Sequence, residues 1–132
     1  SAYEVIYIDE LDWANPESNA RIMQGYVFDI GVMSVSNTKF NKAKCAFKAI
    51  EYMACGIPVV ASAIGEAEFL IQDGVNGFLT HTEEDWVRHI ISLAANVELR
   101  ARLGDAAIKT IAEQYSYKVI VPKINSFLRE LA

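Results

Sequence analysis

The sequence predicts an α/β fold in which a Rossmann-like parallel sheet is flanked by helices. Short, largely apolar segments at residues 28–33 and 57–62 are typical of strands that are covered on both faces. Segments with helical periodicity alternate with them, and this alternation favours right-handed crossovers between parallel strands. The 132 residues are 52% hydrophobic and 22% charged, which is the composition of one globular domain.

The N-terminal part is expected to contribute two strands and one helix. Residues 3–8 are rich in β-branched and aromatic side chains and predict a strand. The Asn-Pro-Glu sequence at 15–17 predicts a helix that runs to about Tyr26, because proline suits the first helical position and an acid suits the positive end. The strand at 28–33 follows, and a polar loop continues from 34 to 41.

The clearest helix is predicted from about Lys44 to Ala54, and it leads into the strand at 57–62. Gly56 lies between them, where a left-handed helix cap is expected. The apolar residues of this helix are spaced at i, i+3, i+4, i+7 and i+8, and they are Ala46, Ala49, Ile50, Met53 and Ala54. One face of the helix is therefore expected to pack against the sheet.

Residues 65–80 are expected to form a short helix, an Asn-Gly turn and a strand at 78–80. Three helices then complete the chain, and the first begins with a capping box at 82–85. The other two are indicated by periodic apolar residues over 99–111 and 117–131, with Pro122 either kinking or restarting the last helix.

Charge and cysteine content exclude several classes of protein. The net charge of −5 disfavours nonspecific binding to nucleic acids or acidic membranes. The longest uncharged apolar stretch, Ile57–Gly65, is about half the length that a membrane-spanning helix needs. Cys45 and Cys55 are expected in one helix about 15 Å apart, beyond the reach of a disulfide. Because two cysteines cannot complete a metal quartet, we expect no metal and a reducing, cytoplasmic location.

Four lysines lie within ten residues that contain no acid: Lys39, Lys42, Lys44 and Lys48. Lys42 and Lys44 are expected at the positive end of the predicted helix, where each cation opposes the macrodipole by about 0.3–1 kcal/mol. The other predicted helix starts carry acids, so this exception indicates an anion site. Lys44, Lys48 and Glu51 are spaced at i, i+4 and i+7 and are expected on one helix face. Such cations, with a carboxylate beyond them, would suit a diphosphate and its ribose.

A structural interpretation is open for the same residues. Lys48 and Glu51 could form an ordinary surface pair at i, i+3. Ser62 lacks the neighbouring glycines of a nucleophile elbow, so a serine nucleophile is not expected. The remaining conspicuous side chains are interpreted as packing or surface residues, namely Trp13, His81, Trp86 and His89.

The segment from Lys44 to Ser62, KCAFKAIEYMACGIPVVAS, closely resembles the core donor-site motif of the group 1 (family 4) glycosyltransferases. Residues 73–79, DGVNGFL, resemble the next conserved block of that family. Residues 99–104 and 115–116 are similar to its C-terminal helices. Residues 28–33 are similar to the strand that precedes the donor loop. The resemblance therefore extends from about residue 28 to the end of the chain.

This resemblance implies two facing Rossmann-like domains, the GT-B fold, of which residues 1–132 would form the C-terminal, sugar-nucleotide-binding domain. The chain would be a fragment without the first β-α units of that domain and without the N-terminal acceptor domain. Such enzymes transfer a sugar from a nucleoside-diphosphate sugar to a saccharide or lipid-linked acceptor. They retain the anomeric configuration and generally need no metal or other cofactor. The intact enzyme would bind no nucleic acid and could associate peripherally with a membrane.

The resemblance also implies roles for individual residues. Glu51 matches the second glutamate of the family's pair, which usually binds the ribose, whereas Ala43 stands where the first glutamate would be. Lys44 stands where the usual motif has a small residue, in a Lys-Cys-x-x-Lys form that resembles a subfamily variant. We expect Lys44 and Lys48 to act as catalytic residues that stabilise the diphosphate leaving group. Substrate contacts are expected from Glu51 and from the segment before it, Ala43, Cys45, Ala46 and Phe47.

A second class of function is a non-catalytic α/β nucleotide-binding or signalling module, for instance one that resembles a receiver domain. A receiver needs acidic residues at strand ends and an aspartate on a central strand that accepts a phosphoryl group. Met33 and Ser62, which end the two central predicted strands, supply neither. The sequence therefore favours the glycosyltransferase interpretation.

Overall fold

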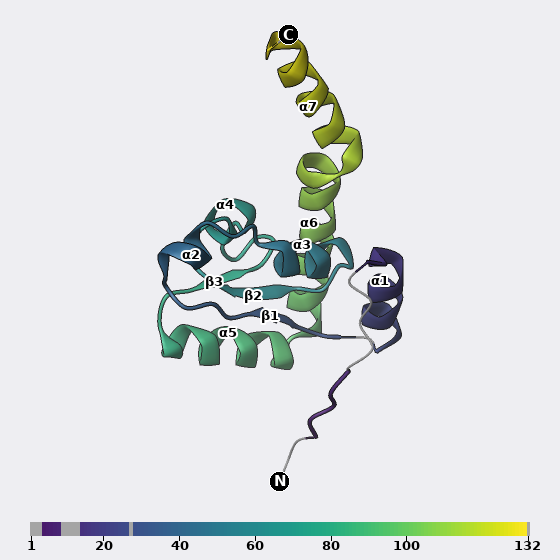
Figure 1. Ribbon diagram of the computed structural model, residues 1–132. Coiled ribbons are helices and arrows are strands. Elements are labelled where there is room, and N and C mark those ends of the chain that lie inside the picture. The colour runs from purple at the N-terminus through teal and green to yellow at the C-terminus, as the bar shows by residue number, and fades with distance from the viewer. Residues whose placement is uncertain (1–3, 9–13, 27, 132) are drawn as a thin grey trace.

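The computed structural model describes residues 4–8, 14–26 and 28–131, and its centre is a parallel sheet with helices on both faces (Figure 1). The strands lie in the order β1-β2-β3, and Val60 in the middle strand pairs with Val32 on one side and Phe78 on the other. Their bounds are β1 (Gly31–Met33), β2 (Val59–Ser62) and β3 (Phe78–Thr80). The predicted parallel α/β sheet is therefore confirmed.

The described helices are α1 (Pro16–Gly25), α2 (Lys39–Lys42), α3 (Phe47–Ala54), α4 (Ala67–Leu70), α5 (Glu83–Ala95), α6 (Val97–Thr110), the π-helical turn η1 (Ile111–Tyr115) and α7 (Tyr117–Leu131). Two predicted helix starts are confirmed in detail. Asn15 accepts a hydrogen bond from the amide of Ser18 at the start of α1. Thr82 and Asp85 form the predicted capping box at the start of α5.

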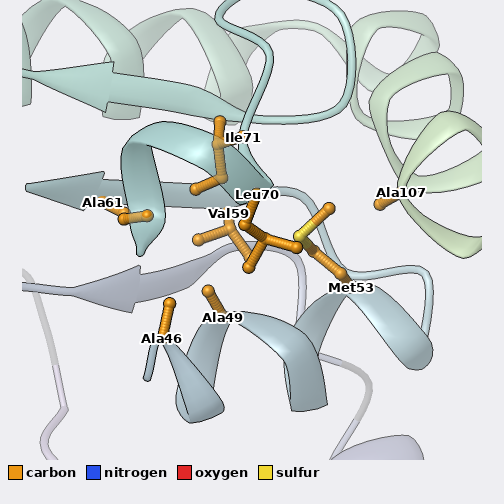
Figure 2. Close-up of a cluster of buried hydrophobic side chains, with 9 residues drawn as sticks. Ala46, Ala49, Met53, Val59, Ala61, Leu70, Ile71 and Ala107 are labelled. Atoms are coloured by element: carbon orange, nitrogen blue, oxygen red, sulfur yellow. The ribbon is translucent and has the colours of Figure 1, made fainter. Parts of the chain in front are cut away.

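Helix α3 buries its small apolar residues against one face of the sheet (Figure 2). Ala49 and Met53 are fully buried, and alanine at the contact lets the helix backbone lie close to the strands. Helix α5 covers the opposite face, where Val60 packs with Leu93 and Leu103. Each large apolar side chain buried in these layers stabilises the fold by roughly 1.5–3 kcal/mol.

The N-terminal strand prediction is wrong for the residues that the structure describes. Residues 4–8 form no strand, and Val5, Ile6 and Tyr7 are exposed. No described strand pairs with them, and an isolated extended segment cannot satisfy a strand's hydrogen bonds. The strand expected from residue 28 begins only at Gly31, because pairing with β2 starts at that residue. Residue 3 and Trp13 lie outside the described residues.

The predicted start of the third helix is also wrong. α3 begins at Phe47 rather than near Lys44, and the lysine-rich segment before it folds as the separate helix α2, which starts inside the predicted loop. Thr38 caps α2, and the buried Ala46 has a non-helical backbone that separates the two helices. Cys45 therefore lies outside the helix that ends beside Cys55. Both cysteines are free, and Ala54, expected in the apolar stripe, is exposed.

The last helices continue one another away from the sheet (Figure 1). α6 runs into η1, and after Ser116 the chain continues as α7. Pro122 lies inside α7, and the helix does not restart there. No residue of α7 is buried, and several of its apolar side chains, among them Phe127 and Leu128, are more than half exposed.

Gly56 and Gly104 provide a test of how α6 packs against the turn that follows α3. Gly56 has a φ of 73°, which confirms the predicted left-handed cap, and Gly104 of α6 packs closely against it. A Cβ added at Gly104 would collide with the carbonyl oxygen of Gly56. We expect Gly104→Ala to lower the free energy of unfolding by about 1–3 kcal/mol, measured by chemical denaturation. Gly25→Ala is the control, because no atom lies within 4 Å of its added Cβ, and equal losses in both variants would contradict this packing.

Candidate functional site

The carboxyl ends of the three parallel strands meet at one edge of the sheet, where ligands of open α/β sheets bind. The connection after β1 leads through α2 to α3, and the connection after β2 contains Gly65. Gly65 has a φ of 61°, and a Cβ at this position would lie 2.7 Å from the carbonyl oxygen of Lys42. The two connections are therefore in direct contact. α3 crosses back along the sheet, so its N-terminus opens at this edge (Figure 1).

The N-terminus of α3 differs from those of the capped helices. The side chain at the N-cap accepts an amide hydrogen bond in α1, α2, α5 and α6. In α3 the N-cap is Ala46, whose methyl group has no acceptor, and the first turn carries no acid. The positive end of the α3 dipole is therefore compensated neither by an N-cap acceptor nor by an acid of the first turn, which is favourable for an anionic ligand.

Lys48 and Glu51 form an ion pair in the first two turns of α3. The Lys48 Nζ lies 2.9 Å from Glu51 Oε2, and the lysine side chain is 41% exposed while the glutamate side chain is 13% exposed. Among the described residues, no well-aligned hydrogen bond reaches this buried Glu51 oxygen. A carboxylate removed from water is costly unless it is paired, so the lysine stabilises it. The i, i+3 pair that the structural interpretation predicts is present.

Glu51 also borders a cavity of about 450 Å³ between α1, α3 and the segment that follows α6. The other lining side chains are mainly apolar or aromatic, among them Met23, Phe47 and Tyr117. The thiol of Cys55 lines the same cavity, and burial together with the negative charge of Glu51 raises its pKa. The cavity has the size and lining of a small-molecule site, and Glu51 is its acidic group.

Lys44 lies apart from this pair. Its ammonium is 4.6 Å from the centre of the Phe40 ring, a cation–π contact, and the residue precedes α3. The expectation that Lys44 shares a helix face with Lys48 and Glu51 is therefore wrong. It rested on a helix start three residues too early. Lys42 ends α2 and does not begin α3, so it is not at the positive end of that helix.

The other expected contact residues follow one another along the connection between α2 and α3. Ala43 is the C-cap of α2, Cys45 is exposed, Ala46 is buried as the N-cap of α3, and Phe47 is half-exposed as its first residue. The structure thus brings Lys48 and Glu51 together and places the remaining expected residues beside the N-terminus of α3.

The same edge of the sheet contains residues that the sequence did not indicate as a site. A polar hollow of about 470 Å³ lies over the carboxyl ends of the strands and the start of α5. Ser62 and Thr80 line it, but their hydroxyls are used internally, the first accepting from the amide of Val35 and the second donating to the carbonyl of Ala61. His81 and Trp86 also line it. The signal that could have placed these residues at one site is the parallel order of the strands, because the carboxyl ends of parallel strands meet at one edge of the sheet.

Two further classes of site find no support in the described part of the chain. No cluster of three or more His, Cys, Asp or Glu side chains there could hold a metal ion. The three described strands end at Met33, Ser62 and Thr80, so none ends in the aspartate that a receiver domain requires. His89 is buried and stacks on Phe78 with 4.1 Å between ring centres, as expected for a packing residue, and burial lowers its pKa.

Within the described ranges, we find no helix with the length and hydrophobicity of a membrane span.

Comparison with known proteins identifies similar sequences. The family described as "Glycosyl transferases group 1" matches residues 33–110. The D-inositol 3-phosphate glycosyltransferase of Saccharomonospora viridis is 34% identical over 84 residues, which are 62% of this chain and 19% of that protein. An uncharacterized glycosyltransferase of Methanocaldococcus jannaschii is 33% identical over 86 residues, or 64% of this chain and 24% of that protein. The matched region thus spans about a fifth to a quarter of these relatives.

Solved structures with a similar fold include the following three. HepE from Anabaena, solved in complex with UDP-glucose, has a TM-score of 0.64 and 25% identity, covering 77% of this chain and 28% of that one. Sucrose-phosphate synthase from Thermosynechococcus elongatus has a TM-score of 0.59 and 27% identity over 63% of this chain and 21% of that one. The C-terminal domain of a group 1 glycosyl transferase from Francisella tularensis has a TM-score of 0.60 and 21% identity, covering 85% of this chain and 52% of that one. At this identity the match supports the fold alone.

Proposed function

This chain belongs to the group 1 glycosyl transferases, and we propose that it forms the donor-binding part of a retaining enzyme. The intact enzyme would transfer a sugar from a nucleoside-diphosphate sugar to a saccharide or lipid-linked acceptor. The observation that carries the proposal is the position of α3. Its uncapped N-terminus opens at the carboxyl edge of the sheet, and Lys48 and Glu51 follow in its first two turns, all within the matched residues. The complex of the similar HepE structure with UDP-glucose supports the same ligand class.

The chemistry of transfer matches the charges at α3. Negative charge grows on the diphosphate oxygen as the glycosidic bond breaks, and fixed dipoles and cations stabilise it best when they are already in place. The first amides of α3 provide such dipoles, and Lys48 provides a cation one residue into the helix. In this proposal no metal is needed to neutralise the leaving group.

In this proposal, Lys48 and Glu51 exchange each other for groups of the donor when the donor binds. Lys48 is 41% exposed, so its ammonium can turn from Glu51 toward the diphosphate, while ribose hydroxyls donate to the carboxylate. The Glu51 carboxylate then has a polar partner throughout, the Lys48 ammonium before binding and the ribose hydroxyls after it, which avoids the cost of an unpaired charge. The cavity beside Glu51 would hold part of the nucleoside, since its lining is mainly apolar and aromatic.

The experiment that tests this function uses the intact protein with UDP- and GDP-sugars. Proton NMR of the product is expected to show the same anomeric configuration as the donor. The 132-residue chain alone is expected to transfer no sugar, because the proposed acceptor domain that brings the reactants together is not part of it. An inverted product would contradict the retaining proposal. Sustained transfer by the 132 residues alone would contradict the assignment of this chain to the donor side only.

A further inference from the structure

The polar hollow at the carboxyl edge has features of a second ligand site. It is lined by the connections that follow all three strands and by the first turn of α5. Its volume of about 470 Å³ lies within the range of small-molecule sites. Ile64 lines it and immediately precedes Gly65, which contacts the connection to α3. The hollow therefore lies beside the segment where we place the donor.

Several polar side chains of the hollow are available to a ligand. Ser62 and Thr80 are used internally, as described above. In contrast, five other lining side chains take part in no hydrogen bond or ion pair with any residue that the structure describes. These are Ser34, Asn37, His81, Glu83 and Trp86. Together they offer hydroxyl, amide, imidazole, carboxylate and indole groups, which can both donate and accept.

The composition of this lining restricts the class of ligand. No lysine or arginine lines the hollow, and Glu83 would repel an anion. The half-buried indole of Trp86 provides an apolar face beside these polar groups, and it packs against the buried cluster of Val60, Leu93 and Leu103. Neutral polyhydroxylated molecules present hydroxyls along their edges and C–H groups on their faces. We propose that the hollow binds a neutral saccharide.

Within the proposed function, this saccharide would be part of the acceptor, and that assignment depends on the donor role of α3. Binding of a neutral saccharide does not depend on it. The contact between Gly65 and Lys42 places the two sites on adjoining connections, as a transfer between their ligands requires.

The test follows the indole ¹H–¹⁵N signal of Trp86 in the intact protein during titration with maltose and with cellobiose. We expect at least one disaccharide to shift this signal with a dissociation constant on the order of 1 mM. Asn37→Ala and Glu83→Gln are expected to weaken binding about five- to tenfold, the effect of losing one hydrogen bond. Glu84→Gln is the matched control. It removes the same charge from the same helical turn, but Glu84 does not line the hollow.

Several results would overturn the saccharide site. The proposal is wrong if neither disaccharide shifts the Trp86 signal, if Glu84→Gln weakens binding as much as Glu83→Gln, or if inorganic phosphate shifts the signal in place of the sugars. A parallel titration with UDP separates the two proposals. UDP binding without saccharide binding overturns only the hollow, whereas saccharide binding without UDP binding overturns the donor role and supports the saccharide site.

Discussion

Replacing Lys48 with alanine is expected to lower the turnover of the intact enzyme by about 100- to 1000-fold, the usual effect of removing one group that stabilises transition-state charge. The negative charge on the leaving oxygen is greatest in the transition state, so turnover should fall more than donor affinity. Steady-state kinetics and the dissociation constant of the nucleoside diphosphate distinguish the two effects. The matched control is Lys109→Ala, which breaks the exposed i, i+4 pair with Glu113 away from the site.

The stability of the Lys48→Ala variant has two opposing contributions. Removing a cation from the first turn of α3 favours the folded protein by up to about 1 kcal/mol. Losing the ion pair disfavours it, because the Glu51 side chain is largely buried. The melting temperature should therefore change little, and a large fall in turnover would report chemistry rather than unfolding. Wild-type turnover in this variant would show that Lys48 only pairs with Glu51.

The Lys44→Ala variant distinguishes the contribution of Lys44 from that of Lys48. Sequence spacing placed both lysines on one helix face, but Lys44 lies over Phe40 before the helix begins. Its removal should give none of the stability expected from relieving a helix dipole. If Lys44 also binds the diphosphate, its variant weakens nucleoside diphosphate binding. Variants of both lysines that bind and turn over like the wild type would contradict the whole diphosphate site.

Glu51→Gln is expected to raise the dissociation constant of the donor about 10- to 150-fold, which corresponds to roughly 1.5–3 kcal/mol for a hydrogen bond to a charged group. Glutamine keeps the size of the side chain but has only one acceptor oxygen and no charge. Isothermal titration with UDP and kinetics with the donor sugar measure the loss. Circular dichroism should show an unchanged fold.

Glu113→Gln is the control for Glu51→Gln, since Glu113 is also paired with a lysine but is exposed and lies outside the proposed site. Equal donor constants for Glu51→Gln and the wild type would mean that Glu51 serves only as the partner of Lys48. The residue at the position of the family's first glutamate is Ala43, the C-cap of α2, so of the two expected glutamate positions only that of Glu51 carries a carboxylate.

The parallel sheet could be predicted because its signals are local. β2 is buried along its whole length, and the small residues of α3 recur with helical spacing. Each of these elements could therefore be predicted from its own residues. The capping box at Thr82 and the left-handed Gly56 are equally local. In contrast, residues 4–8 have the composition of a strand, but a strand also needs a neighbour, which composition does not reveal.

The start of α3 could not be read from periodicity alone. Ala46 fits the apolar stripe, yet it is buried with a non-helical backbone, and Thr38 starts α2 ahead of it. Because of this difference, Lys44 does not share a helix face with Lys48 and Glu51, which form an ion pair. The polar hollow was missed for a different reason. Asn37 and Trp86 are far apart in the sequence and are brought together only by the order of the strands.

The most direct test of the donor site is a titration of the intact protein with UDP and GDP, followed through the backbone amide signals. We predict that one of the two nucleotides shifts the amides of Phe47, Lys48 and Ala49 most strongly, because these groups open α3. Residues at the opposite edge of the sheet, such as Ala101 of α6, should stay unchanged. If neither nucleotide shifts the first turn of α3, or if the largest shifts lie at that opposite edge, the assignment of α3 as the donor site is wrong.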